Sequence, residues 1–174
     1  MPPTSSGRPI ARLATELRVS GIGQFALGFA CLAAALSASD LPPARAIVPF
    51  VVAFVAVGAL SVRGSRWMRS ATTPPAAPDL AVEEPGLTIR RTLVGLAVAL
   101  LAVAVTSALG PGLSVVLGGV VAAAGAVDIR NYNWARGREA ALGADLFRQT
   151  GRSPLAGGRR ALYTRPTSES TLAT

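Results

Sequence analysis

The chain alternates between long uncharged apolar blocks and shorter polar segments. The blocks cover residues 19–39, 46–62, 92–109 and 112–127. A helix that crosses a bilayer needs about 20 predominantly apolar residues, and none of the blocks contains Asp, Glu or Arg. The pattern therefore predicts an all-α integral membrane protein. We expect a four-helix bundle, built from two helical hairpins, over residues 19–130.

Proline and glycine mark the turns between these blocks. Pro42 and Pro43 separate the first two blocks, and Gly110-Pro111-Gly112 divides the long uncharged stretch 92–127. Such residues interrupt helices, and this stretch is too long for one span of about 20 residues. We therefore expect two short spans joined by a tight turn. A re-entrant hairpin that does not cross the bilayer is the alternative.

The polar segments complete the predicted organisation. Residues 1–18 form a cytoplasmic N-terminal segment, and residues 63–91 form a cytoplasmic Pro-rich loop. Residues 131–150 fit an amphipathic juxtamembrane helix with Trp134, Ala141, Leu142 and Leu146 near one face. Residues 151–174 lack periodicity and are expected to be a disordered basic tail. A cleaved signal peptide is the alternative for the first block, but its apolar core is longer than the usual range of about 7–15 residues.

The arginines predict the orientation. All 17 basic residues are arginine, and the net charge is +8. Basic residues accumulate on the cytoplasmic side of spans, and sixteen arginines fall on one side of this topology against Arg45 alone on the other. Both termini are therefore expected in the cytoplasm. The absence of lysine, with many Ala, Gly and Pro residues, indicates a high-GC bacterium and hence its cytoplasmic (inner) membrane.

The residue types limit the chemistry. The chain has no histidine, and Cys31 is its single cysteine. Histidine-based catalysis and an intramolecular disulfide are thereby excluded, and we expect no cofactor, no metal site and no enzymatic activity. Asp128 follows the fourth block, where a carboxylate opposes the helix dipole, and is expected to pair with Arg130.

Candidate helix-packing residues are polar or small. Gln24 is the strongest polar residue within a block, and it would either bond a neighbouring helix or contact a substrate. Small residues at four-residue spacing let helices approach closely in lipid, whether inside the monomer or between chains, although an Ala-rich chain also produces such stripes by chance. The candidates are Gln24, Ala26, Ala30, Ala34, Gly118, Gly119, Ala122 and Ala126.

A second set of candidates lies at the predicted membrane surface. Arginine attracts anionic head groups, and tryptophan favours the interface; a plain orientation signal explains the same residues. The candidate anionic-lipid contacts are Arg63, Arg66, Trp67, Arg69, Arg130 and Trp134. The basic tail has no aromatic interleaving, so nucleic acid is not favoured as a partner.

No motif identifies a family. The interpretation that fits best is a non-enzymatic inner-membrane protein that acts as an accessory or assembly partner of a larger membrane complex. Its expected partners are the anionic bilayer and either another membrane protein or a second copy of the chain. The alternative is a small passive channel or transporter subunit without proton coupling, whose lining would have to come from Gln24, Thr106 and Ser107.

Overall fold

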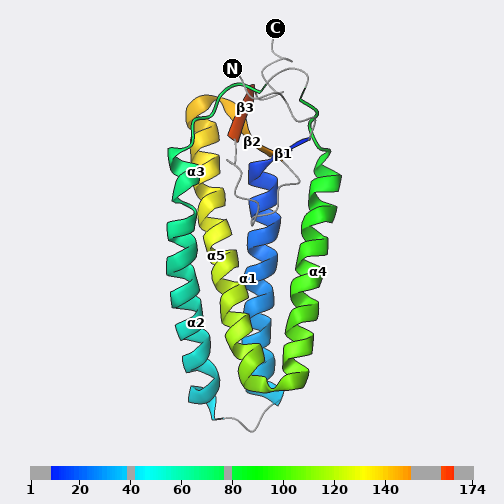
Figure 1. The fold of residues 1–174 in the computed structure, drawn as a ribbon, viewed down its shortest axis with the longest axis vertical. Helices are drawn as coiled ribbons and strands as arrows, with labels where there is room; N and C mark the ends of the chain where they lie inside the picture. The colour runs from blue at the N-terminus through cyan, green and yellow to red at the C-terminus, as the bar shows by residue number, and fades with distance from the viewer. Residues whose placement is uncertain (1–8, 39–41, 77–79, 150–161, 167–174) are drawn as a thin grey trace.

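The computed structural model describes residues 9–38, 42–76, 80–149 and 162–166. Four long helices run side by side, and a small sheet covers one end of them (Figure 1). The helices are α1 (Leu13–Ala38), α2 (Pro43–Gly64), α4 (Pro85–Leu109) and α5 (Pro111–Leu142), and a short helix, α3 (Arg66–Ser70), follows α2. All four long helices are long and apolar enough to cross a membrane. The predicted mostly helical, four-helix architecture is confirmed.

Close approach of backbones holds α1 and α5 together at the centre of the bundle. Gly28 of α1 faces Gly118 and Ala122 of α5, and a Cβ atom at Gly28 would lie 2.5 Å from the Gly118 carbonyl oxygen. Only glycine allows this contact. α2 packs on α5, whereas α4 packs on both α1 and α5. Among the described residues α4 is the least enclosed of the four, and its buried residues are Thr88 and Val103.

The turn between α4 and α5 consists of one residue. α4 ends at Leu109, Gly110 has a φ of 155°, and Pro111 opens α5. This positive φ favours glycine, and proline is well suited to the first turn of a helix because its missing N–H has no partner there. The predicted division at this sequence is confirmed, and each helix is long enough to span a bilayer.

A three-stranded antiparallel sheet corrects the all-α prediction. β1 (Ile10–Arg12) pairs with β2 (Ala144–Gln149), which pairs with β3 (Leu162–Pro166). Leu146 and Leu162 are fully buried against Leu13 and Leu17 at the start of α1, together with Met68 and Ala135. We call this end of the bundle the sheet end. The sheet forms because it covers apolar side chains that the helix ends leave exposed.

The predicted amphipathic helix over 131–150 is wrong in its bounds and in its face. α5 continues without a break to Leu142, and Gly143, in the left-handed conformation, ends it before β2 begins. The buried face of this extension carries Asn131, Ala135 and Glu139, whereas Ala141 and Leu142 are exposed and Leu146 lies on a strand. Glu139 is accommodated because its carboxylate accepts bonds from the Leu146 N–H and from Arg136.

The loop and the tail also differ from the prediction. α2 and α4 extend into the predicted loop 63–91, which leaves 71–84 as the connection between α3 and α4. This connection bonds Ile10 of β1, through Ala81 and Glu83, and Thr164 of β3, through Pro74 and Ala76. β3 contradicts the predicted disorder over 162–166, because Leu162 is buried and its strand pairs with β2. Residues 150–161 and 167–174 lie outside the described part.

Candidate functional site

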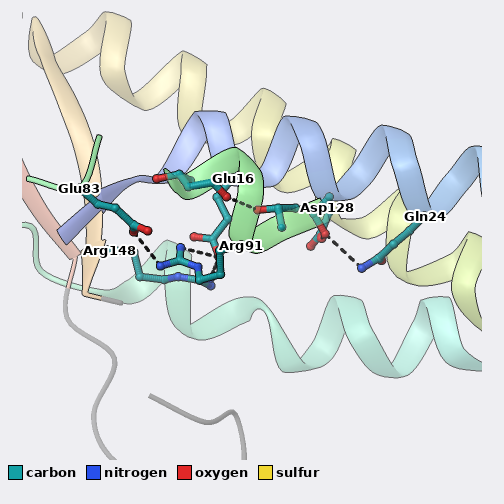
Figure 2. Close-up of polar contacts among 9 residues, drawn as sticks. Glu16, Gln24, Glu83, Arg91, Asp128 and Arg148 are labelled. Atoms are coloured by element: carbon teal, nitrogen blue, oxygen red, sulfur yellow. Dashed lines mark hydrogen bonds and ion pairs between the residues drawn. The ribbon is translucent and has the colours of Figure 1, made fainter. Parts of the chain in front are cut away.

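Three polar side chains lie on one face of α1 near the sheet end. Glu16, Ser20 and Gln24 are four residues apart, so they follow one another along the helix at intervals of about 6 Å. Figure 2 shows Gln24 farther along the helices from the strands than Glu16. The row therefore leads from the charged sheet end into the apolar part of the bundle.

Asp128 of α5 lies opposite this row. Ser20 Oγ donates a hydrogen bond to Asp128 Oδ2 at 2.8 Å, and Gln24 Nε2 donates to Ser20 Oγ at 3.1 Å. The expected pairing of Asp128 with Arg130 is wrong: Arg130 is exposed, and Asp128 forms no salt bridge with any described residue. The reason is that α5 continues past residue 128, so Asp128 lies within a helix that faces α1, not at a free helix end.

Charged residues from β2, from α4 and from the connection before α4 surround Glu16. Arg148 of β2 forms a hydrogen-bonded ion pair with the Glu16 carboxylate, and Arg91 of α4 lies 3.7 Å from the same oxygen. Arg91 also bonds Glu83, in the connection before α4, at 2.7 Å. The pairs join the sheet, α1 and α4 at one place (Figure 2). They fix the sheet end against a helix that otherwise packs loosely.

A pocket of about 340 Å³ opens between these elements. Its polar lining comes from α1, α4, α5 and β2, and Leu17, Gly95 and Leu96 supply apolar wall. The polar lining residues are Glu16, Ser20, Gln24, Arg91, Thr92, Asp128 and Arg148. We call this cavity the α1–α4–α5 pocket.

Two buried acceptors at the pocket have no hydrogen-bond partner among the described residues. They are Glu16 Oε2 and Gln24 Oε1. The hydrogen bonds run from Gln24 to Ser20 and from Ser20 to Asp128. Their direction determines which Gln24 atom is left without a partner, because one hydroxyl proton can serve only one acceptor. Ser20 gives its proton to Asp128, so it must receive one from the Gln24 amide nitrogen, and the amide oxygen remains available. Buried acceptors of this kind are normally satisfied, so the pocket is suited to a ligand that donates.

The predicted packing residues separate into two groups. Gly118, Gly119 and Ala122 are buried in α5, and Ala126 is half-buried. Ala26, Ala30 and Ala34 of α1 are exposed; they do not mediate internal packing, which uses Gly21, Gly28 and Ala35 instead. Gln24 donates a hydrogen bond to Ser20 of its own helix, and Ser20 in turn donates to Asp128 of α5.

The candidate lipid contacts all lie at the sheet end. Arg63, Arg66, Arg69 and Arg130 are exposed. Trp67 and Trp134 are half-buried and pack against the cluster formed by Leu13, Leu17, Met68, Ala135, Leu146 and Leu162. The tryptophans therefore contribute to the contact between sheet and helices, and the arginines remain accessible.

Sequence reasoning missed the pocket itself. The four-residue spacing of Glu16, Ser20 and Gln24 was a readable signal of one polar face. The contributions of Arg91, Arg148 and Asp128 depended on where α4 and α5 begin and end, and a charge pattern does not give those positions. Among the described residues, no group of three Cys, Asp or Glu side chains gathers as a metal site.

Comparison with known proteins does not place the chain in a family. The chain matches no protein-family model, no curated protein and no solved structure. Its function must therefore be argued from the fold and the pocket.

Proposed function

We propose that this chain is a multi-pass protein of a bacterial cytoplasmic membrane that acts, without enzymatic activity, as an interaction partner within a larger membrane assembly. The observation that carries the proposal is an exposed strip of small residues on α1, formed by Ala26, Ala30 and Ala34. Small side chains make few van der Waals contacts with lipid, but they allow a second helix to approach closely. The partner is therefore expected to be a membrane-spanning helix of another chain.

The loose packing of α4 supports the same proposal. Leu93, Val98 and Leu101 are each more than half exposed, at 52, 63 and 64%. α5 shows the opposite, since it buries glycine and alanine along its length. A helix enclosed this little by its own chain leaves most of its surface for lipid or for neighbouring helices.

The proposal predicts that Ala30→Leu weakens assembly without damaging the fold. Ala30 is exposed, so leucine fits the monomer, but its bulk would separate α1 from a helix that packs on the strip. We expect tagged Ala30→Leu, expressed in native membrane, to retain less of its co-purifying chain than wild type at equal thermal stability. Ala59→Leu, an equal change on the exposed face of α2, is the control. Equal recovery in both variants would contradict the proposal.

A passive channel, the alternative function, has less support. The polar lining of the α1–α4–α5 pocket does not continue past Gln24 and Leu96 in the described chain, and α1 and α5 touch at Gly28 and Gly118. Thr106 and Ser107 donate to carbonyls of their own helix. Selective solute flux through reconstituted wild type, lost in Gln24→Leu, would support the channel instead.

The orientation is part of the proposal and has its own test. Arg63, Arg66 and Arg69 lie at the sheet end, and Arg45 lies near the opposite end, in the first turn of α2. By the preference of basic residues for the cytoplasmic side, the sheet end is cytoplasmic, and its exposed arginines contact anionic head groups. Reporters fused after Thr174 and inserted after Ser70 should report cytoplasm, and one at Pro43 should report the outside. A periplasmic signal at Thr174 would contradict this orientation.

A further inference from the structure

One carboxyl group that lines the α1–α4–α5 pocket, that of Asp128, forms no salt bridge with any described residue. Both arginines of the lining are engaged elsewhere: Arg148 pairs with Glu16, and Arg91 pairs with Glu16 and with Glu83, which lies outside the lining. Asp128 has no such partner within the described chain, where its carboxyl group accepts a hydrogen bond from the Ser20 hydroxyl. Buried charges in proteins are normally paired or extensively hydrogen-bonded. Asp128 is therefore the group in this pocket that a positively charged occupant would pair with.

The free acceptors define how that occupant would bind. Glu16 Oε2 and Gln24 Oε1 are buried and accept no hydrogen bond from the residues that the structure describes, and none of these residues donates to Asp128 Oδ1. An ammonium group has three N–H donors and no acceptor. Gln24 and Asp128 are joined through Ser20, whereas Glu16 lies two helical turns from Gln24. An ammonium group at Asp128 can therefore donate to Asp128 Oδ1 and Gln24 Oε1, and its positive charge suits a carboxyl partner.

The size and walls of the pocket indicate more than a bare ion. A volume of about 340 Å³ lies within the usual range for small organic ligands. A single monovalent ion would leave most of this space to water and would not contact Leu17 or Leu96. We propose that the pocket binds a primary ammonium group carried on a short aliphatic stem, with the ammonium at Asp128 and the stem against Leu17, Gly95 and Leu96.

The surroundings suit such a molecule. The arginines at the pocket are already paired with Glu16 and Glu83 (Figure 2), which reduces their repulsion of an entering cation. α4 forms one wall, and it is the least enclosed long helix among the described residues. An amphiphilic amine can therefore place its charged head among polar groups and its stem beside an apolar helix. The site makes no use of the α1 strip, so its test is independent of the proposed assembly role.

Hexylammonium, 1-hexanol and hexanoate share one stem and differ in charge, which makes them suitable probes. Purified full-length protein in detergent at pH 7 is titrated with each, and binding is followed by calorimetry. Hexylammonium is expected to bind at least about tenfold more tightly than hexanol, the usual effect of a charge-assisted hydrogen bond, and hexanoate more weakly than either. Asp128→Asn, which preserves shape and removes the charge, should abolish the preference for hexylammonium. Asp145→Asn, the same change on β2 away from the pocket lining, should retain it.

A second variant keeps the test decisive if Asp128→Asn does not fold. Gly95 lines the pocket, and a Cβ atom there would meet nothing within 4 Å, so Gly95→Leu should fold and weaken hexylammonium binding by occupying the space of the stem. Equal affinity of the wild type for hexylammonium and hexanol would overturn the proposal. So would unchanged binding in either pocket variant, or sodium chloride that competes as effectively as hexylammonium.

Discussion

Replacing Gly28 with leucine is expected to destabilise the bundle by more than about 3 kcal/mol, at or above the upper end of overpacking costs. A Cβ atom at Gly28 would lie 2.5 Å from both the Gly118 carbonyl oxygen and the Ala122 Cβ, and 2.6 Å from the Ala122 amide nitrogen. Two of these neighbours are backbone atoms, which no rotamer change can move. α1 and α5 would have to separate along their most extensive contact.

Ala30→Leu is the matched control for this change. Ala30 is two residues away on the same helix but is exposed, so its side chain can grow into lipid or detergent. Thermal unfolding of both purified variants in one detergent would compare them. A Gly28→Leu protein as stable as Ala30→Leu would show that α1 and α5 do not touch where the structure brings them together.

Removing the Glu139 side chain is expected to detach the sheet from the helices. The carboxylate has an exposed fraction of only 5% and lies 3.0 Å from Arg136 and 3.9 Å from Arg12. It also accepts the Leu146 N–H at 3.1 Å. Glu139→Ala would leave this amide without its acceptor and weaken the ties of both arginines. We expect a loss of about 2–3 kcal/mol, below the usual cost of breaking a buried pair because both arginines are partly exposed.

Arg136→Ala removes only the partly exposed ion pair of Glu139 and keeps its buried bond to the Leu146 N–H. Arg136 is 54% exposed, and an exposed pair at this spacing contributes only about 0.3–0.5 kcal/mol. Hydrogen exchange at Leu146 and Phe147 would report the state of the sheet directly. Equal protection of β2 in Glu139→Ala and wild type would contradict the anchoring role of Glu139.

The four helices were predictable because the bilayer imposes a strong condition on sequence. Each span must be long and uncharged, and the breaks at Pro42-Pro43 and Gly110-Pro111 are equally plain. The packing faces were harder to predict. In α1 the buried small residues are Gly21, Gly28 and Ala35, seven apart, and the exposed Ala26, Ala30 and Ala34 form an equally regular pattern. Composition alone does not distinguish these faces, because small residues occur on both.

The sheet and the pocket were not predictable from local pattern. β1 has three residues, too few for a periodicity, and its partner strand lies near the other end of the chain. The extension of α5 buries Asn131 and Glu139, whereas an amphipathic analysis searches for an apolar face. Asp128 was placed at a helix end because it is the first charged residue after the uncharged block 112–127. Its contact with Ser20 follows from the three-dimensional packing of α1 on α5.

The pairing of β1 with β2 also determines when the sheet can form during synthesis of the chain. Arg12 and Asp145, which form an ion pair across these strands, are 133 residues apart. At usual rates of synthesis, roughly 7–27 s separate the appearance of the two residues. During that interval the first helices exist without the strand that covers their start, and Glu16 lacks its partner Arg148. A nascent chain that ends before residue 144 therefore presents an uncovered apolar end, a feature by which quality-control proteases could recognise it.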